Sequence, residues 1–220
     1  MNVRTLLLAA AAVLVAGTAN AATIVGLYST GVDNSGVAVS GNGADLHWTL
    51  NGGSAFTGAT NGQFPIGPWV ADTAASRWLT PTPNAADSFD PTTDGAYDYT
   101  LTFNLTAAQA AGASFTGQFA ADNTVTAIML NGHDLGSGGG FSSWTGFDAA
   151  APDFKAGQNT LTFDVDNFAQ NGGNPTGLNV QFLSSAAGPV PEPATWSIML
   201  VGFGGLGAAL RASRRRRLAV

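Results

Sequence analysis

The sequence predicts an all-β protein: a jelly-roll β-sandwich, preceded by a signal peptide and followed by a single C-terminal transmembrane helix. Three observations lead to this prediction. The first residues are apolar and end in a small-residue cleavage pattern. The middle of the chain alternates apolar and polar residues between clusters of Gly, Asn and Asp. The last residues combine an apolar segment with a group of arginines.

The first 21 residues have the composition of a secretory signal peptide. Arg4 precedes an unbroken apolar stretch from Leu6 to Val15, and Ala19 and Ala21 form an Ala-x-Ala cleavage pattern. The apolar stretch is too short to span a bilayer comfortably, and no basic stop-transfer flank follows it. We therefore expect residues 1–21 to be removed and the rest of the chain to be exported.

Residues 22–183 are predicted to form one β-sandwich domain. In the clearest strand, Tyr97–Leu105, every second residue is apolar, so one face packs and the other meets water. A second strand, Thr124–Leu130, runs into Asn131-Gly132, a strong type I′ hairpin signal because both turn residues must accept a positive φ. Further strands are expected at Ile24–Tyr28, Leu46–Leu50, Ser114–Phe119, Leu161–Val165 and Leu178–Phe182, and a loop at Gly136–Gly140. Many short strands joined by glycine-rich loops favour the jelly roll.

Two shorter segments complete the domain. Thr106–Ala111 is the one stretch with helical character, with Thr106 as its N-cap and Gly112 as its C-terminal stop. Residues 184–189 are small and turn-rich, so we expect a linker there.

The composition of the domain excludes several functions. Between residues 22 and 190, Arg77 and Lys155 are the only basic residues against thirteen Asp, which gives a net charge of −11. Such a surface repels phosphate groups, so we expect no nucleic-acid partner. The chain has no cysteine, which excludes thiol catalysis and cysteine-ligated zinc.

The C-terminal residues 190–217 form a distinct segment. A Pro-Glu-Pro sequence precedes an apolar, glycine-rich stretch at about 194–210, and a basic tail at 211–217 follows. An aromatic residue at one border and arginines at the other are typical of a transmembrane helix with a cytoplasmic C-terminus. The residues that define the segment are Val190, Pro191, Glu192, Pro193, Trp196, Arg214, Arg215, Arg216 and Arg217.

In their order and spacing, these residues resemble the PEP-CTERM sorting signal, also labelled an ice-binding-protein C-terminal domain. The resemblance implies that exosortase, a membrane enzyme, recognises the Pro-Glu-Pro segment and passes the protein to the outer surface. The implied partners are exosortase, the export machinery and, through the C-terminal helix, the membrane. The implied location is the membrane during sorting, then the cell surface or extracellular matrix of a Gram-negative bacterium. We infer no ice binding from the label.

The folded domain is similar, less specifically, to the galactose-binding-like jelly rolls that serve as carbohydrate-binding modules and as accessory domains of glycosidases. The matching fragments are Ala121-Asp122-Asn123, Leu130-Asn131-Gly132, and the turns at residues 157–161 and 174–178. The resemblance implies a non-catalytic glycan-binding module. The cell's own exopolysaccharide is the expected ligand.

The residues expected to carry such binding follow from its chemistry. Aromatic side chains contact the apolar face of a sugar, and the candidate glycan contacts are Trp48, Trp69, Trp78 and Trp144. Each tryptophan is also consistent with packing in the core or in a loop. No organic cofactor is expected. A structural calcium ion would use hard oxygen ligands, for which Asp33, Asp122 and Asn123 are the candidates.

Enzymatic activity is not expected. Glycosidases need two suitably placed carboxyl groups, and the domain offers only aspartates without a recognisable catalytic context. The sequence also lacks the Gly-x-Ser-x-Gly motif of α/β-hydrolases. Two alternatives to a glycan-binding module remain: a structural matrix protein without a specific ligand, and a polysaccharide hydrolase.

Overall fold

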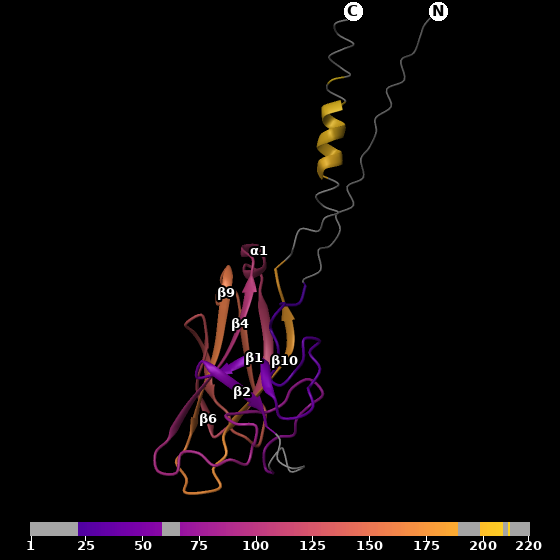
Figure 1. Ribbon diagram of the computed structural model, residues 1–220. Helices are drawn as coiled ribbons and strands as arrows, with labels where there is room; N and C mark the ends of the chain where they lie inside the picture. Colours follow the sequence, from indigo (N-terminus) through magenta and orange to yellow (C-terminus); the bar gives the residue numbers. More distant parts are fainter. Residues whose placement is uncertain (1–21, 59–66, 189–198, 209–210, 212–220) are drawn as a thin grey trace, which may run out of the picture. The chain divides into compact units, whose positions relative to one another are not determined.

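Antiparallel strands form nearly all of the regular structure in the domain (Figure 1). This computed structural model describes residues 22–58, 67–188, 199–208 and 211. Within them, the elements of the domain are β1 (Ala44–Leu50), β2 (Gly53–Thr57), β3 (Leu79–Thr80), β4 (Gly95–Leu105), α1 (Ala107–Ala110), β5 (Ser114–Asp122), β6 (Thr124–Leu130), β7 (His133–Gly138), β8 (Thr145–Ala150), β9 (Gly157–Asn167) and β10 (Gly177–Ala186).

The ten strands belong to one sheet, in the order β7-β6-β9-β4-β1-β2-β3-β10-β5-β8. The short strands β2 and β3 join a half built on β4, β9 and β6 to a half built on β10, β5 and β8. The two end strands, β7 and β8, approach each other, so the sheet is nearly closed. The prediction of an all-β domain is confirmed. The hydrogen-bonded sheet is continuous through β2 and β3.

The burial pattern of β4 confirms the prediction that the apolar side chains of this strand form its buried face. Tyr99, Leu101 and Phe103 are buried, while Asp98 and Thr102 on the other face are exposed. Because the pleat sends successive side chains to opposite faces, this alternation fixes the register of β4 against β9, which pairs with it along its whole length.

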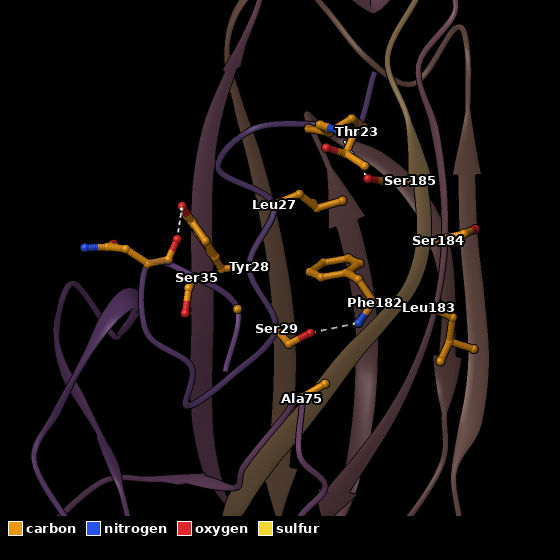
Figure 2. Close-up of a pocket in the computed structure, with 13 residues that line it drawn as sticks. Thr23, Leu27, Tyr28, Ser29, Ser35, Ala75, Phe182, Leu183, Ser184 and Ser185 are labelled. Atoms are coloured by element: carbon orange, nitrogen blue, oxygen red, sulfur yellow. Dashed lines mark hydrogen bonds between the residues drawn. The ribbon is translucent and has the colours of Figure 1, made fainter. Parts of the chain in front are cut away.

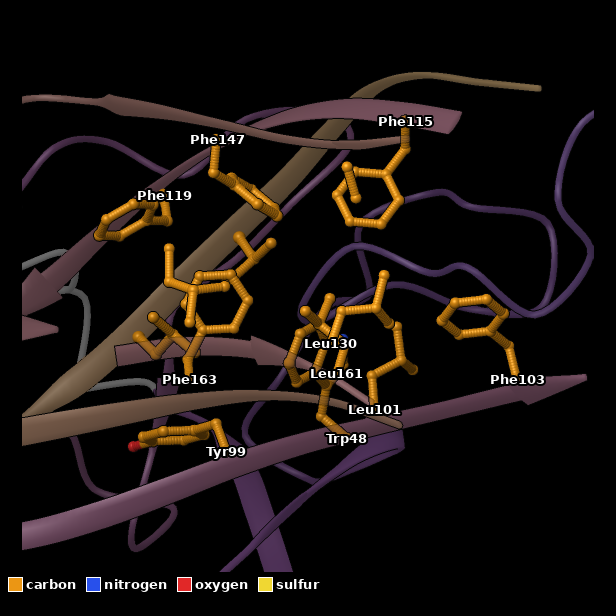
Figure 3. Packing of buried hydrophobic residues seen from close by; sticks show 14 of the residues in the cluster. Trp48, Tyr99, Leu101, Phe103, Phe115, Phe119, Leu130, Phe147, Leu161 and Phe163 are labelled. Carbon is orange, nitrogen blue, oxygen red and sulfur yellow. The ribbon is translucent and has the colours of Figure 1, made fainter. Parts of the chain in front are cut away.

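The main core lies between the two halves of the sheet (Figure 3). Phe119 of β5 and Phe147 of β8 face Phe163 of β9, with ring centroids 5.5 and 5.2 Å from that of Phe163. All three rings are buried, and Phe163 is completely so. Burial of one such side chain stabilises the fold by about 1.5–3 kcal/mol. Aromatic packing therefore holds together a domain that has no disulfide.

The predicted hairpin and helix are both present. Asn131 and Gly132 have φ values of 55° and 89°, as a type I′ turn requires. Thr106 caps α1, because its hydroxyl accepts a hydrogen bond from the Gln109 N–H at 3.2 Å and the Gln109 side chain bonds back at 2.8 Å. The prediction of a loop at Gly136–Gly140 is wrong in part. Strand β7 continues to Gly138, because it pairs with β6.

The ends of the domain also differ from expectation. Residues 24–28, predicted as a strand, contain no strand and instead lie beside β10, where the Ile24 N–H bonds to the hydroxyl of Ser185 at 3.2 Å. Strand β10 continues to Ala186, because its backbone pairs with β5 as far as Ser114. The first three residues of the predicted linker at 184–189 are thus part of the sheet.

The chain divides into two compact units, one of which is residues 21–190. That unit holds all ten strands and both clusters of buried apolar side chains, so it has everything that an independently folding domain needs. In the other unit, residues 199–208 are helical. Among the residues that the structure describes, no helix has the length and apolar character needed to cross a membrane. The predicted signal peptide and the sorting-motif residues Val190 to Trp196 and Arg214 to Arg217 lie outside the described residues.

Candidate functional site

Three of the four tryptophans predicted to contact a glycan, Trp48, Trp69 and Trp78, are buried. Trp48 is 1% exposed and its indole N–H donates a 2.9 Å hydrogen bond to the carbonyl of Tyr28. Trp78 is fully buried and donates at 2.8 Å to the carbonyl of Val70. Neither indole presents a face to solvent, and in the described structure Trp48 and Trp78 are packing residues.

The other two tryptophans belong to a smaller apolar cluster beside the main core. Trp69 and Trp78 pack with their ring centroids 4.2 Å apart and an angle of 34° between their planes. Ala120 of β5 completes the buried part of the cluster, and the half-buried Trp144 and Phe141 pack against it. The structure therefore brings together three of the predicted tryptophans, at the end of the sheet where β5 gives way to β6.

Asp122 ends β5 next to this cluster. The Trp69 indole N–H donates a 2.8 Å hydrogen bond to Oδ2 of Asp122, and the Thr176 hydroxyl donates to its backbone carbonyl. Asp122 is 6% exposed. Burial raises the pKa of its carboxyl group to about 6, although the hydrogen bond from Trp69 acts in the opposite direction. The carboxylate is thus the main form at neutral pH, and Oδ1 accepts no hydrogen bond from the described residues.

Asn123 links the two halves of the sheet, since it is the single residue between β5 and β6. Its backbone N–H donates at 3.0 Å to the carbonyl of Asp166, and its Oδ1 accepts from the Phe168 N–H at 2.6 Å. The first bond fixes the backbone of Asn123, and the second orients its side-chain amide. The Nδ2 group remains available as a donor, because its hydrogens have no partner among the described residues.

Asp122, Asn123 and Trp69 line one cleft of about 260 Å³, here called the Asp122 cleft. The remaining lining residues are Gly67, Pro68, Phe141, Gln170, Gly173, Asn174 and Pro175. Asn174 uses its Nδ2 group to donate to the carbonyls of Phe89 and Phe168, at 2.9 and 3.0 Å. Gln170 uses its Nε2 group in the same way, on the carbonyls of Gly172 and Gly173.

This arrangement leaves a defined set of polar atoms at the cleft. Oδ1 of Asp122, Oδ1 of Asn174 and Oε1 of Gln170 can each accept a hydrogen bond, and Nδ2 of Asn123 can donate one. The rings of Phe141, Pro68 and Pro175 add apolar surface. A cleft that combines three acceptors, one donor and apolar walls suits a small ligand with both hydroxyl groups and apolar C–H surface.

The predicted calcium ligands are not grouped around one point. Oδ1 of Asp33 accepts hydrogen bonds from the backbone N–H groups of Ser35 and Val37 and from the Ser35 hydroxyl, at 2.6 to 3.0 Å. These bonds lower the pKa of Asp33 and close its own loop. Asp122 is bound by Trp69 instead. Within the described part of the chain, no three acidic or histidine side chains cluster in a way that could hold a metal.

A second hollow, of about 370 Å³, lies between the N-terminal segment and the end of β10 (Figure 2). We call it the Tyr28 groove. Its lining residues are Thr23, Ile24, Leu27, Tyr28, Ser29, Asn34, Ser35, Gly36, Ala75, Phe182, Leu183, Ser184 and Ser185. No pattern in the sequence indicates this groove, because the wall that faces β10 is irregular backbone whose path no periodicity predicts.

Gln170, Asn174 and Phe141 also line the Asp122 cleft without having been predicted to do so. Asn174 was visible only as part of a turn, and nothing in the local sequence distinguishes Gln170 from any solvent-exposed amide. These residues reach the cleft through hydrogen bonds between distant loops, such as that from the Phe89 N–H to the Asn174 carbonyl at 2.8 Å. Only the three-dimensional structure brings them together.

Comparison with known proteins identifies the C-terminal segment. The model of the PEP-CTERM protein-sorting motif matches residues 189–216, which coincide with the segment predicted from the sequence. No curated protein matches the chain. A motif of this kind implies processing by exosortase and export to the cell surface in Gram-negative bacteria. The protein therefore carries a PEP-CTERM sorting motif at the C-terminal end of a chain whose folded part is a ten-stranded antiparallel β domain.

Proposed function

We propose that this protein is an exported cell-surface or extracellular-matrix protein whose β domain is a non-catalytic glycan-binding module, with the Asp122 cleft as its binding site. The observation that carries the proposal is the set of polar atoms at the cleft, namely three acceptors and one donor held in place by other hydrogen bonds. They belong to residues from separate segments of the chain that line the cleft together with apolar rings.

The chemistry of a sugar matches this set. Each sugar hydroxyl can donate and accept, and the C–H groups of a pyranose ring give it an apolar face. The amides of Asn123, Gln170 and Asn174 are already oriented by bonds to the backbone, so binding would cost little additional side-chain entropy. Trp69 contributes to the wall and fixes the carboxylate, and Trp144 supports the cluster behind it.

The cleft favours binding over hydrolysis. Asp122 is the single acidic side chain that lines it among the residues described, whereas glycosidases of the usual kind place two carboxyl groups about 5–10 Å apart. One carboxylate with a fixed hydrogen-bond donor can orient a hydroxyl group. It does not supply both an acid and a nucleophile or base.

The same proposal includes the fold family: we propose that the domain is a galactose-binding-like jelly roll. A nearly closed antiparallel sheet whose halves pack face to face is compatible with a galactose-binding-like jelly roll, and the Asn131-Gly132 hairpin agrees with the resemblance. The acidic surface argues against nucleic acid as a partner. In this proposal, the segment at 194–210 holds the chain in the membrane until exosortase acts, and the exopolysaccharide of the producing cell is the ligand.

Glycan-array binding by purified residues 22–190, with and without calcium, tests the proposal. We expect saturable binding to a defined class of glycan, with a change in tryptophan fluorescence because three tryptophans lie at or behind the cleft. Asp122→Asn and Gln170→Ala should each weaken binding by about tenfold, since each removes a polar contact worth about 1–1.5 kcal/mol. Asp148→Asn, at an exposed aspartate of β8 outside the cleft, is the matched control and should bind as the original protein does.

Two results would contradict the proposal. If no glycan binds in either condition, including the producer's own exopolysaccharide, a structural matrix protein is the better account. If reducing sugars are released from the bound polysaccharide, the domain is a hydrolase. A calcium requirement for binding would point to metal ligands beyond those grouped in the structure.

A further inference from the structure

We propose that the Tyr28 groove is a second carbohydrate-binding site, specific for an uncharged sugar chain and independent of the Asp122 cleft. The inference shares the ligand class of the proposed function but rests on different residues. None of the residues that line the cleft also lines the groove. The volume of about 370 Å³ lies within the usual range of roughly 300–1,000 Å³ for small-molecule sites.

The groove carries no charged side chain, which sets the ligand class. Its thirteen lining residues include no Asp, Glu, Lys, Arg or His, although the domain around it contains thirteen Asp. A phosphate, sulfate or uronic acid group would find no cation there and would meet the negative field of the domain. A neutral ligand does not meet this repulsion.

The aromatic ring of Tyr28 gives the groove a rigid side wall. The ring stacks on that of His47, with centroids 3.7 Å apart and planes at 11°. Stacking covers one face of the tyrosine and fixes its orientation, so the ring is already ordered before a ligand arrives. Ordered aromatic side chains of this kind are the surfaces on which the C–H face of a sugar packs.

The hydroxyl groups of the groove offer both donors and acceptors. Oγ of Ser29 accepts from the Phe182 N–H at 3.1 Å, and Oγ of Ser185 accepts from the Ile24 N–H at 3.2 Å. Each of these two hydroxyls therefore keeps its own hydrogen for a ligand. The hydroxyl of Ser35 instead donates its hydrogen to Asp33 at 2.6 Å, so its lone pairs can accept a hydrogen bond from a ligand.

The Tyr28 hydroxyl is also an acceptor for a ligand, because it donates its own hydrogen to the carbonyl of Asn34 at 3.3 Å. Figure 2 shows how these groups are arranged: Leu27 and Phe182 lie in the middle, Tyr28 and Ser35 on one side, and Ser184 on the other. Apolar surface flanked by hydroxyl groups of both polarities matches a chain of sugar rings, in which hydroxyl groups surround apolar ring faces.

Isothermal titration of residues 22–190 tests the inference. The probes are cellohexaose, maltohexaose and laminarihexaose as neutral chains, and an alginate oligomer as the charged one. We expect at least one neutral chain to bind and alginate not to bind at the groove. Tyr28→Ala removes the aromatic wall and should weaken groove binding about tenfold or more. Ala75→Leu adds bulk to the groove without removing a side-chain hydrogen bond and should have the same effect.

The controls separate this site from the Asp122 cleft. Val25→Ala alters a residue that is 75% exposed, belongs to the same segment and does not line the groove, so it should change nothing. A double variant, Asp122→Asn with Gln170→Ala, should lose the cleft and retain binding at the groove. Near-UV circular dichroism checks that each variant is folded. If Tyr28→Ala does not fold, Ala75→Leu decides.

Each outcome is informative. Loss of neutral-chain binding in both groove variants, with residual binding in the cleft double variant, supports the inference. The inference is overturned if both groove variants bind every probe as tightly as the original domain, or if alginate alone binds. In the first of these cases the cleft can still be a site, so the proposed function survives. No binding of any probe overturns the groove site, while the array with native exopolysaccharide still tests the cleft.

Discussion

The indole N–H of Trp69 lies 2.8 Å from Oδ2 of Asp122 and is the side-chain donor that the structure provides to this buried carboxyl group. The bond connects the loop before β3 to the end of β5. A buried acceptor that loses its donor costs about 1–3 kcal/mol. Because Trp69 and Asp122 both line the Asp122 cleft, their hydrogen bond also links the stability of the domain to the geometry of the cleft.

We expect Trp69→Phe to lower the free energy of unfolding by about 1–3 kcal/mol at pH 7.5 and to raise the pKa of Asp122 further, because the hydrogen bond from Trp69 lowers it. Urea unfolding and NMR titration of the Asp122 carboxyl carbon measure the two effects. Trp144→Phe removes the same atoms from a half-buried tryptophan of the same cluster that does not bond to Asp122. A pKa shift of equal size in both variants would show that the hydrogen bond is not the cause.

The raised pKa of Asp122 predicts a pH dependence of stability. Its value of about 6 in the folded state lies above the ordinary 3.8, so the folded state holds the proton more tightly than the unfolded chain. This contribution to stability is fully present below about pH 4 and is lost as the pH rises through about 6. Relative to the original protein, Asp122→Asn should become more stable by about 1–3 kcal/mol between pH 4 and pH 7.

Urea unfolding at intervals of one pH unit, from pH 4 to pH 8, tests this sign. The difference between variant and original should rise with pH and level off above about pH 7. Subtracting the two curves removes the contributions of other groups, such as Asp33, whose pKa is shifted downward. A difference that stays constant with pH would mean that Asp122 is ionised throughout the range.

Asp98 of β4 and Asp164 of β9 are direct cross-strand neighbours. The pKa of Asp164 is raised, first by partial burial and second by the negative charge of Asp98. Like charges in this position are destabilising, and cross-strand pairs are worth about 0.2–1 kcal/mol. Asp98→Asn should therefore raise the melting temperature slightly at low salt, and the gain should shrink in 0.5 M NaCl because salt screens the repulsion. Asp148→Asn serves as the control for a simple change in net charge.

Phe163 is the central ring of the aromatic core, in contact with rings from β1, β5 and β8. Phe163→Ala should lower the free energy of unfolding by about 3–5 kcal/mol, because it removes buried surface and leaves a cavity that the nearly closed sheet cannot fill. Urea unfolding measures the loss. Phe168→Ala, at a ring that is 50% exposed, should cost far less. Equal losses would argue against the packing described.

The sorting motif predicts a change of location. Replacing both Pro191 and Pro193 by alanine removes two defining residues of the motif, whose rings restrict φ, so exosortase should no longer process the chain. The variant should remain in the membrane fraction at full length, whereas the original protein appears at the cell surface with a lower mass. Fractionation and mass spectrometry distinguish the two. Normal release of the variant would show that the match to the motif has no role in sorting.

The sequence predicted the strands whose alternation is strict and the turns whose chemistry is demanding. β4 and the Asn131-Gly132 hairpin follow from local patterns, whereas β6 follows from its apolar composition, because a register shift interrupts its alternation. The N-terminal residues 24–28 are mostly apolar, as a buried strand would be, but do not form a strand. They bond to β10 partly through side chains such as that of Ser185, and no local pattern reveals such a partner.

Part of the candidate site, Asp122 and Asn123, could also be predicted from a local pattern. Asp122 and Asn123 follow an apolar strand and precede another, so their position at a corner of the sheet could be inferred. The roles of the tryptophans could not, because an indole suits both a buried core and an exposed binding surface. Trp78 is fully buried while Trp69 lines a cleft, and only long-range packing decides between them.

The approach of β7 to β8 affects how copies of the domain can associate when their concentration is high. A strand at the border of a sheet can recruit a strand from another molecule, which is a common start of aggregation. Here the two borders lie near each other, and β7 contains Gly136 and Gly138 with positive φ values that interrupt a regular extended edge. A neighbouring copy thus finds no long, flat edge to join at that seam. The fold therefore disfavours association of copies through these two strand edges.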